Sequence, residues 1–295
     1  MKFILVVNPQ SGTKQSSKIL DLIQPIFHTK GAELSIIPTE FSGHAEKIAE
    51  TVSLTGYDGF LALGGDGTFN EVVNGMIKRT TGKRIPIGII PGGSGNSFLR
   101  NLEIGDPIKA SEVITSGNIR LVDTARIEMN SLIRHSINLI GWGLVTDVGK
   151  RAEQLRWLGF SRYTISSIIE ILLKKERKAL LVVDGQPIDS IFTFIVACNS
   201  IHVGRGMKMA PKAKLDDGLI DLIVVKGGLT RGRLLSVLPK LFDGSHINEP
   251  EVEYYQASQF SLYSESIDDL NIDGEMIGNT PIEVTMVRNA IEIFG

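Results

Sequence analysis

The sequence has little cysteine, almost no net charge and no long apolar run. Its single cysteine, Cys198, excludes a disulfide framework, and because this residue lies inside the apolar segment FTFIVAC we expect a buried, unreactive thiol. The 31 basic and 33 acidic residues give a net charge of −2, which does not favour nucleic acid as a partner. No apolar run reaches the roughly 20 residues that a helix needs to span a bilayer.

Targeting and metal-binding patterns are also absent from the sequence. The apolar part of MKFILVVNPQSG is too short for a signal peptide and is followed by no cleavage-like site. The five histidines are scattered, so neither a zinc site nor a Ser-His-Asp triad is indicated. With 42% hydrophobic and 22% charged residues, the sequence predicts a packed globular protein. Because it shows neither a signal peptide nor a membrane span, we expect it in the cytoplasm, with any membrane contact peripheral and at the inner face.

Residues 1–125 alternate strand and helix patterns. The apolar runs FILVVN, ELSIIPT, GFLALG and IPIGIIPGG are typical of strands, and helical patterns follow each of them. In the first helix we expect Pro25 to kink or split the element. The helix after GFLALG shows one apolar stripe, made of Phe69, Val72, Val73, Met76 and Ile77. The alternation predicts an α/β domain with a mainly parallel sheet, in which ligands bind at the carboxyl ends of the strands.

From about Leu121 onward, strand patterns dominate. We expect IRHSINLIGWG to form one strand, and VVDGQPID is typical of a hairpin turn between two strands. Helical patterns remain only around residues 162–177 and 230–243. Residues 126–285 are therefore predicted to form a mostly antiparallel β-sandwich domain.

The segment GGDGT, residues 64–68, follows a predicted strand and opens a predicted helix. Glycine lets the backbone approach a ligand closely, and the free N–H groups at a helix start favour an anion such as phosphate. Asp66 would repel phosphate by itself, so we expect it to act through Mg²⁺ or as a proton acceptor. A tight turn in which Asp66 caps the following helix is the structural alternative. The spacing matches neither the dinucleotide fingerprint nor the P-loop.

Two further turns share this character. NPQSG, residues 8–12, ends the first predicted strand, and PGGSGNSFLR, residues 91–100, ends the fourth. Each turn alone is compatible with an ordinary loop. Because the carboxyl ends of parallel strands meet at one edge of a sheet, the three turns together predict a nucleotide cradle.

The chain resembles the catalytic superfamily of diacylglycerol kinases and sphingosine/ceramide kinases. The blocks that carry the resemblance cover nearly the whole chain in the family's order: NPQSG, TEFSGHA, GGDGTFNEVVNG, PGGSGN, GWGLVTDVGKRAEQLRWLGFSRYT, APKAKLDDGLIDL and NIDGE. The resemblance implies phosphorylation of a lipid hydroxyl with ATP and Mg²⁺ as cofactors. It also implies an NAD-kinase-like α/β domain followed by a β-sandwich domain, with residues 286–295 returning to the first domain.

Carried over by position, the resemblance implies a set of site residues. It places Asp66, Asp273 and Glu275 at the reacting hydroxyl; Glu275 is taken for the proton acceptor in bacterial relatives, and Asp66 in the sphingosine branch. It implies an ATP cradle formed by Asn8, Pro9, Gln10, Ser11, Gly12, Thr39, Gly65, Asp66, Gly67, Thr68, Phe69, Asn70, Glu71 and Ser94.

The resemblance also implies a metal site and a lipid contact. In KLDDGLID, a structural Mg²⁺ would be held by Asp217 with the backbones of Lys214 and Leu219, a donor set that suits this ion. An ordinary turn is the alternative there. Asp147 would contact the polar head of the lipid, or else form an internal ion pair. The loop GSGNSFLR favours a sphingoid-like lipid, whereas GGDG and the DDG loop favour a diacylglycerol-like lipid.

Residues 155–173 combine apolar, aromatic and basic side chains. Such a segment can rest on an anionic bilayer as a peripheral membrane contact, or it can line an acyl-chain pocket. We expect the stripe of Ile165, Ile168, Ile169 and Leu172 to pack on the β domain, and we leave lipid contact and core burial open for Trp157 and Phe160. A homodimer is also compatible with the sequence.

Two other functions remain as alternatives. An NAD kinase would share GGDG and the two-domain plan, although it leaves PGGSGN and the apolar segment 155–173 unexplained. A non-enzymatic nucleotide-binding regulator would have no need of the carboxylates Asp66, Asp273 and Glu275. The lipid kinase accounts for all of these features.

Overall fold

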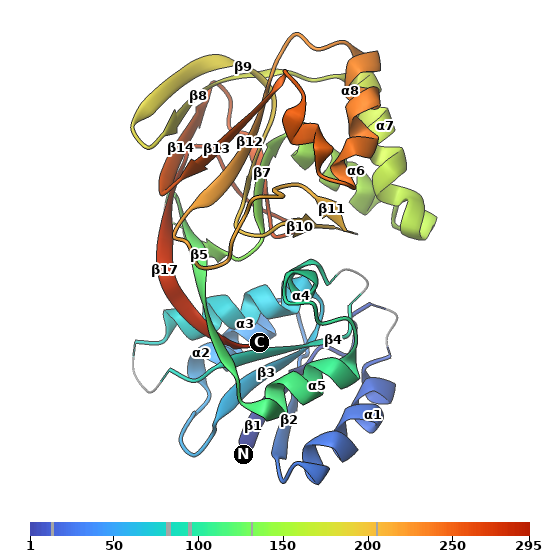
Figure 1. Ribbon diagram of the computed structural model, residues 1–295, viewed down its shortest axis with the longest axis vertical. Coiled ribbons are helices and arrows are strands. Elements are labelled where there is room, and N and C mark those ends of the chain that lie inside the picture. Colours follow the sequence, from blue (N-terminus) through green and yellow to red (C-terminus); the bar gives the residue numbers. More distant parts are fainter. Residues whose placement is uncertain (13–14, 81–83, 94–95, 131, 205) are drawn as a thin grey trace. The chain divides into compact units, whose positions relative to one another are not determined.

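The computed structural model describes residues 1–12, 15–80, 84–93, 96–130, 132–204 and 206–295. The chain divides into two compact units, which are described separately (Figure 1). Unit 1 consists of Met1–Thr124 and Arg288–Gly295, and unit 2 consists of Ala125–Val287.

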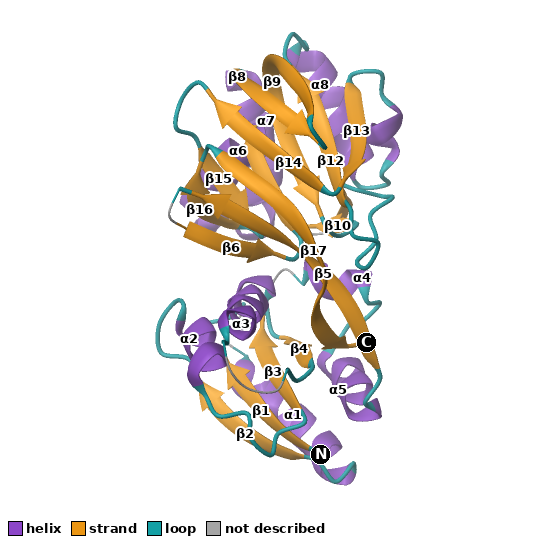
Figure 2. Cartoon of the chain, turned by 90° about the vertical axis from the view of Figure 1, so that its left-hand side faces the viewer, coloured by secondary structure: helices purple, strands orange, loops and turns teal. Residues whose placement is uncertain are grey.

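Unit 1 is a parallel sheet covered by helices. Strands β1 (Lys2–Val7), β2 (Glu33–Pro38), β3 (Gly59–Gly64) and β4 (Ile87–Pro91) lie in the order β4-β3-β1-β2, and the last residues of β17 (Ile282–Phe294) pair in parallel with β4. Helix α2 (His44–Thr51) packs with α3 (Asp66–Lys78), and α1 (Ser16–Thr29) packs with α5 (Pro107–Ser116). The two pairs lie on opposite faces of the sheet (Figure 2), and the short helix α4 (Ser97–Asn101) follows β4.

The sheet of unit 1 forms because its central strands are apolar on both faces. All residues of β3 and β4 are buried, as expected for parallel strands with helices on either side. Phe3 of β1 contacts Phe27 of α1 and Phe294 of β17 edge-to-face, with ring centroids 5.7 and 5.8 Å apart. Phe294 also requires Gly59, since a β-carbon there would lie 2.7 Å from its ring.

The helices of unit 1 follow the predicted patterns with one correction. Phe69, Val72 and Val73 of α3 are buried as the stripe predicts. The expectation that Pro25 splits the first helix is wrong, because α1 continues through it. Pro25 costs the helix one backbone hydrogen bond, whereas Ile23 and Phe27 are buried on either side of it.

Unit 2 is built mainly of antiparallel strands. One path runs β16-β15-β7-β9-β8-β14-β17, β12 and β13 extend from β9, and β6 pairs with β5. The bounds are β5 Ile119–Met129, β6 Leu132–Ser136, β7 Leu139–Gly143, β8 Arg177–Val183, β9 Gln186–Cys198, β12 Ile220–Lys226, β13 Val252–Ala257, β14 Gln259–Ser264, β15 Asp269–Ile272 and β16 Glu275–Asn279. A small hairpin of β10 (His202–Val203) and β11 (Met207–Lys208) stands apart from this sheet.

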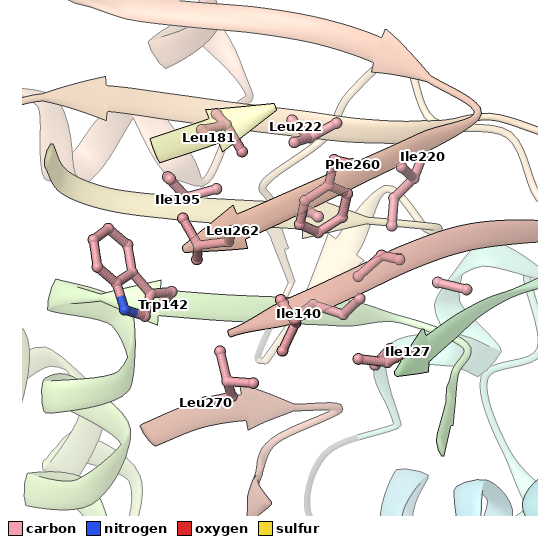
Figure 3. Packing of buried hydrophobic residues seen from close by; sticks show 14 of the residues in the cluster. Ile127, Ile140, Trp142, Leu181, Ile195, Ile220, Leu222, Phe260, Leu262 and Leu270 are labelled. Carbon is pink, nitrogen blue, oxygen red and sulfur yellow. The ribbon is translucent and has the colours of Figure 1, made fainter. Parts of the chain in front are cut away.

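Apolar side chains from these strands form the core of unit 2 (Figure 3). Trp142, Phe192 and Phe260 are its large members, and the rings of Trp142 and Phe192 meet edge-to-face. The predicted hairpin is confirmed: Asp184 and Gly185 both have positive φ and join β8 to β9. Together the parallel sheet of unit 1 and the antiparallel strands of unit 2 confirm the predicted fold class.

One helix and one strand of unit 2 differ from the sequence-based predictions. Helix α6 (Leu144–Gln154) was not expected, and IRHSINLIGWG forms two strands, β6 and β7, rather than one. The remaining helices are η1 (Arg156–Ser161), α7 (Arg162–Leu173), α8 (Arg231–Val237), η2 (Leu238–Leu241) and η3 (Ser245–Asn248). The break between β6 and β7 arises because the amides of residues 137–139 turn toward a buried carboxylate, that of Asp273.

Candidate active site

The three glycine-rich loops of unit 1 pack directly on one another at the carboxyl ends of their strands. A β-carbon on Gly12 would lie 2.6 Å from the carbonyl oxygen of Gly92, and one on Gly93 would lie 2.5 Å from the α-carbon of Gly65. Gly12 also has φ +55°, a conformation that side chains disfavour. The loops after β1, β3 and β4 therefore form one surface of backbone, which a larger residue would separate.

Asn8 joins the first loop to the second. Its side-chain amide donates to Thr68 Oγ1 at 3.1 Å, and its Oδ1 accepts from the backbone N–H of Gln10 at 3.0 Å. Its own backbone N–H donates to the carbonyl of Leu63 at 3.0 Å. The backbone N–H and the side chain of Asn8 thus hold the turn of residues 8–12 against β3 and the GGDG turn.

Asp66 joins the second loop to the third. Its Oδ2 accepts a hydrogen bond from the backbone N–H of Ser97 at 2.8 Å, and its Oδ1 accepts from that of Phe98 at 3.2 Å. The ring centroids of Phe69 in α3 and Phe98 in α4 lie 5.0 Å apart. Asp66 therefore caps α4, the helix after β4, whereas the alternative considered from the sequence had it capping α3.

Glu71 holds the loop after β2. Its carboxylate accepts hydrogen bonds from the backbone N–H groups of Gly43 at 2.9 Å and Ala45 at 3.1 Å, and so caps α2 from the neighbouring helix. Thr39 lies at the end of β2, where its N–H donates to Val7 of β1 at 2.8 Å.

The structure brings most of the predicted cradle together within unit 1. Asn8–Gly12, Thr39 and Gly65–Thr68 lie at the carboxyl ends of β1, β2 and β3. Phe69 is fully buried and Asn70 nearly so, which makes their side chains part of the helix packing. Ser94 lies outside the described residues.

In unit 2, Asp273 forms a buried anchor. Its carboxylate accepts hydrogen bonds from Ser136 Oγ at 2.7 Å and from the backbone N–H groups of Ile137, Asn138 and Leu139 at 3.0, 2.9 and 2.9 Å. Burial raises the pKa of Asp273, and these hydrogen bonds act in the opposite direction by favouring the anion. All three amide donors belong to the chain that leads from β6 into β7.

Glu275 follows this anchor directly. Asp273 and Gly274, with φ +51° and +92°, form the two-residue turn of the β15–β16 hairpin, in which Ile272 pairs with Glu275. Glu275 is exposed whereas Asp273 is buried. The hairpin thus separates the two predicted catalytic carboxylates: one is held inside unit 2, and the other stands on its surface.

Asp147 of α6 is engaged in an ion pair. Both of its oxygens lie within 3.0 Å of Nη2 of Arg177, at the start of β8, and the side chain of Asp147 is nearly buried. Arg177 also lies 3.5 Å from Asp268, which accepts a hydrogen bond from Trp142 Nε1. The sequence did not indicate Arg177, because the pairing joins residues 30 positions apart with no motif between them.

The DDG turn places Asp217 near a second carboxylate, that of Asp221. Asp217 Oδ1 accepts a hydrogen bond from the backbone N–H of Leu219 at 3.0 Å. Behind it, fully buried Asp221 is hydrogen-bonded to Tyr254 and Gln256 through Oδ1, and its Oδ2 has no hydrogen-bond partner. Burial raises the pKa of Asp221, and the nearby Asp217 carboxylate adds to this rise. In the part of the chain that the structure describes, no three His, Cys, Asp or Glu residues gather as a metal site.

Helix α7 buries two polar side chains together with the apolar Ile171. Ser166 and Glu170 are buried, and Glu170 forms an ion pair with Arg151 of α6. Ile168 and Leu172 are 40% and 53% exposed, so the expected packing of that stripe is wrong for them, and Trp157 is 79% exposed. The Arg151–Glu170 ion pair fixes this orientation of the helix. Among the described residues, no helix combines the length and apolar character needed to cross a membrane.

Two family models match the chain. Residues 2–127 match the diacylglycerol kinase catalytic domain, and residues 138–295 match the YegS C-terminal NAD kinase beta sandwich-like domain. The second match alone covers more than half of the chain.

Named relatives agree with these matches. The diacylglycerol kinase of Staphylococcus carnosus is 31% identical, with 98% of this chain and 94% of the relative aligned, and that of Bacillus subtilis is 29% identical over the same shares. Sphingosine kinase 1 of Arabidopsis thaliana is 29% identical over 88% of this chain, which spans 64% of that relative's length.

Solved structures lead to the same family. A crystal structure of a diacylglycerol kinase from Bacillus anthracis matches with a TM-score of 0.80 and 26% identity, covering 99% of this chain and 96% of the other. An NAD kinase from Archaeoglobus fulgidus in complex with ATP has a TM-score of 0.50 and 13% identity, which shows a shared fold alone. The predicted resemblance is confirmed: the chain belongs to the family of diacylglycerol and sphingosine kinases, phosphotransferases that act on an alcohol group.

Proposed function

We propose that the protein uses ATP and Mg²⁺ to phosphorylate a hydroxyl group of a diacylglycerol- or sphingoid-like lipid. The observation that carries the proposal is the packing of the three glycine-rich loops in unit 1, where Gly12 meets Gly92 and Gly93 meets Gly65. Glycines packed this closely leave backbone N–H groups, rather than side chains, to face a ligand. Such N–H groups at loops and helix starts are suited to the phosphates of a nucleotide.

The proposed chemistry is an in-line phosphoryl transfer. The lipid hydroxyl oxygen bonds to the γ-phosphorus, the bond from phosphorus to ADP breaks, and a carboxylate takes the hydroxyl proton. Glu275 suits the role of proton acceptor, since it is exposed and fixed by the hairpin turn that Asp273 anchors. Asp66 suits a positioning role, because both of its oxygens accept hydrogen bonds from the start of α4. Its negative charge also lies at the glycine-rich loops. Proton transfer to a positioned base contributes about 10²–10⁴-fold.

The DDG turn fits a structural Mg²⁺. Asp217 with the backbone carbonyls of Lys214 and Leu219 would hold the ion, and the unpartnered Oδ2 of buried Asp221 marks a place where positive charge is favourable. Such a cation neutralises carboxylate charge. Tyr254 also keeps the turn in place. Its Oη donates a hydrogen bond to Asp221 and accepts one from the backbone N–H of Lys212.

We propose further that the segment of Trp157 and α7 rests on the membrane that supplies the lipid. Trp157, Leu172 and Leu173 are at least half exposed, and Arg231 donates to the backbone carbonyl of Leu172 at 2.7 Å, which places a guanidinium beside them. Apolar side chains bordered by cations suit an anionic bilayer surface.

A panel of acceptors tests the activity. The protein is incubated with labelled ATP, Mg²⁺ and, in separate reactions, micellar diacylglycerol, sphingosine, ceramide, monoacylglycerol and NAD. We expect label in diacylglycerol or in a sphingoid base, with its loss when EDTA is added. Label in NAD alone would overturn the lipid kinase, and ATP binding with no labelled product would favour a nucleotide-binding regulator.

Asp147 can be tested on the same panel. Because Arg177 engages both oxygens of Asp147, Asp147→Asn is expected to lower turnover of every accepted lipid by a similar factor. A loss confined to acceptors with an amino group would instead show direct contact with a charged lipid head.

Vesicle co-sedimentation tests the membrane contact. The variant Trp157→Ala/Leu172→Ser is expected to bind phosphatidylglycerol vesicles more weakly than the unmodified chain. Ile267→Ser is the matched control, because Ile267 is an apolar side chain outside this segment that is 81% exposed. Equal binding by the three proteins would place the membrane contact elsewhere.

A further inference from the structure

The loop after β2, which belongs to the block TEFSGHA, carries an exposed aromatic pair, Phe41 and His44. Phe41 is 56% exposed, and its ring lies parallel to that of His44, with centroids 4.5 Å apart and planes 10° apart. His44 covers one face of the Phe41 ring. An exposed aromatic ring supported on one face in this way is a stacking platform for a flat ligand.

The platform is held in place from two directions. The backbone N–H of Glu40 donates to Nδ1 of His44 at 3.0 Å, which fixes the imidazole ring at the first residue of α2. Glu71 accepts hydrogen bonds from Gly43 and Ala45 on either side of His44. Because Glu71 belongs to α3, the helix that the GGDG turn opens, the aromatic pair is tied to the glycine loops.

The position of the pair suits one part of a nucleotide. β2 is the edge strand next to β1, and the glycine loops follow β1, β3 and β4. Neighbouring strands lie about 4.8 Å apart, so the end of β2, which leads into the loop of the pair, stands roughly 5–15 Å from the ends of β1, β3 and β4. If the phosphates of a nucleotide lie on the glycine-rich loops, its base can extend over this distance to the loop after β2.

We propose that Phe41 stacks against the purine base of the nucleotide whose phosphates lie on the glycine loops. The inference rests on the proposed use of ATP and adds the subsite for the base. Stacking on an aromatic face tolerates different bases, because each base has a π-face. Phe41 therefore contributes to nucleotide affinity with little discrimination between adenine and guanine.

Titration calorimetry with two probes tests the subsite without a lipid acceptor. Mg·ATP contains a base, whereas Mg·tripolyphosphate presents only phosphates. Phe41→Ala is expected to weaken ATP binding roughly tenfold and to leave tripolyphosphate binding unchanged. Phe41→Tyr is expected to retain ATP affinity, and Ile36→Ala, a change on β2 before the loop at a side chain that is 37% exposed, is the matched control.

The outcomes separate this inference from the proposed function. If the unmodified chain binds neither probe, the use of ATP itself is overturned. If it binds both and Phe41→Ala binds ATP as tightly as before, only the base subsite is overturned. Equal weakening for both probes would also overturn it, since it would show a general effect on the loops. A Phe41→Trp variant adds a second readout: its added fluorescence should be quenched by ATP and not by tripolyphosphate.

Discussion

The carboxylate of Asp66 accepts a hydrogen bond of 2.8 Å from the backbone N–H of Ser97, which makes the turn after β3 and the helix after β4 a single structural piece. The two residues are 31 positions apart in the sequence. The contact gives Asp66 a positioning role in addition to its charge, and the two roles can be separated by substitution.

Asp66→Asn should retain the fold and lose the activity. Asparagine caps helices about as well as aspartate but keeps only one of the two acceptor oxygens, so we expect the free energy of unfolding to fall by about 1 kcal/mol. We expect kcat/KM for lipid phosphorylation to fall by about 10²-fold or more, because the charge at the glycine loops is removed. Asp106→Asn is the control, since Asp106 caps α5 through two hydrogen bonds of 2.9 Å that its Oδ1 alone accepts. Unchanged turnover in Asp66→Asn would reduce Asp66 to a cap.

Glu71→Ala should loosen the loop after β2. The change leaves the amides of Gly43 and Ala45 without their acceptor, and we expect a loss of about 1–2 kcal/mol in the free energy of unfolding together with a higher KM for ATP. Urea denaturation and steady-state kinetics measure the two effects. Glu50→Ala, at an exposed position on α2, should change neither. A normal KM despite the lost stability would show that the loop does not take part in nucleotide binding.

Substitutions of Asp273 and Glu275 should both lower the activity and should differ in their effect on stability. In Asp273→Asn, an amide group would face donors that now point at a carboxylate, and we expect a loss of about 2–4 kcal/mol in stability with reduced activity. Glu275→Gln changes an exposed side chain, so thermal stability should remain while kcat falls. Thermal unfolding and turnover, measured on both variants, test the pair. A stable, active Asp273→Asn protein would contradict the anchoring role.

His135 should make the stability of unit 2 depend on pH. Burial first, and then the nearby Arg126 guanidinium, lower the pKa of His135 from 6.5 to about 4. Between these values the unfolded chain binds more protons than the folded one, so stability should fall as the pH decreases from 6.5 toward 4, by up to about 3 kcal/mol. Urea denaturation of the unmodified chain and of His135→Gln across this range should show a smaller slope for the variant. His28→Gln, on the exposed surface of α1, should keep the full slope.

Much of the fold could be predicted from local patterns. The buried runs of β3 and β4, the apolar stripe of α3 and the Asp184–Gly185 turn are all written in short stretches of sequence. The errors arose where distant residues act. The break between β6 and β7 depends on Asp273, which lies more than 130 residues away, and the orientation of α7 depends on the pairing of Glu170 with Arg151.

The sequence by itself determined the alternation that builds a parallel sheet, the antiparallel second unit and the family blocks, because periodicity and motif spacing are local properties of a chain. Only the tertiary structure decided which groups the acidic side chains bind. Asp66 binds the start of α4 and Glu71 binds the start of α2. Asp147 pairs with the Arg177 guanidinium, and Asp273 binds the link from β6 to β7. The physical reason is that a hydrogen bond needs two atoms within about 3 Å. The spacing of residues along the sequence does not show which residues from separate strands and helices come this close.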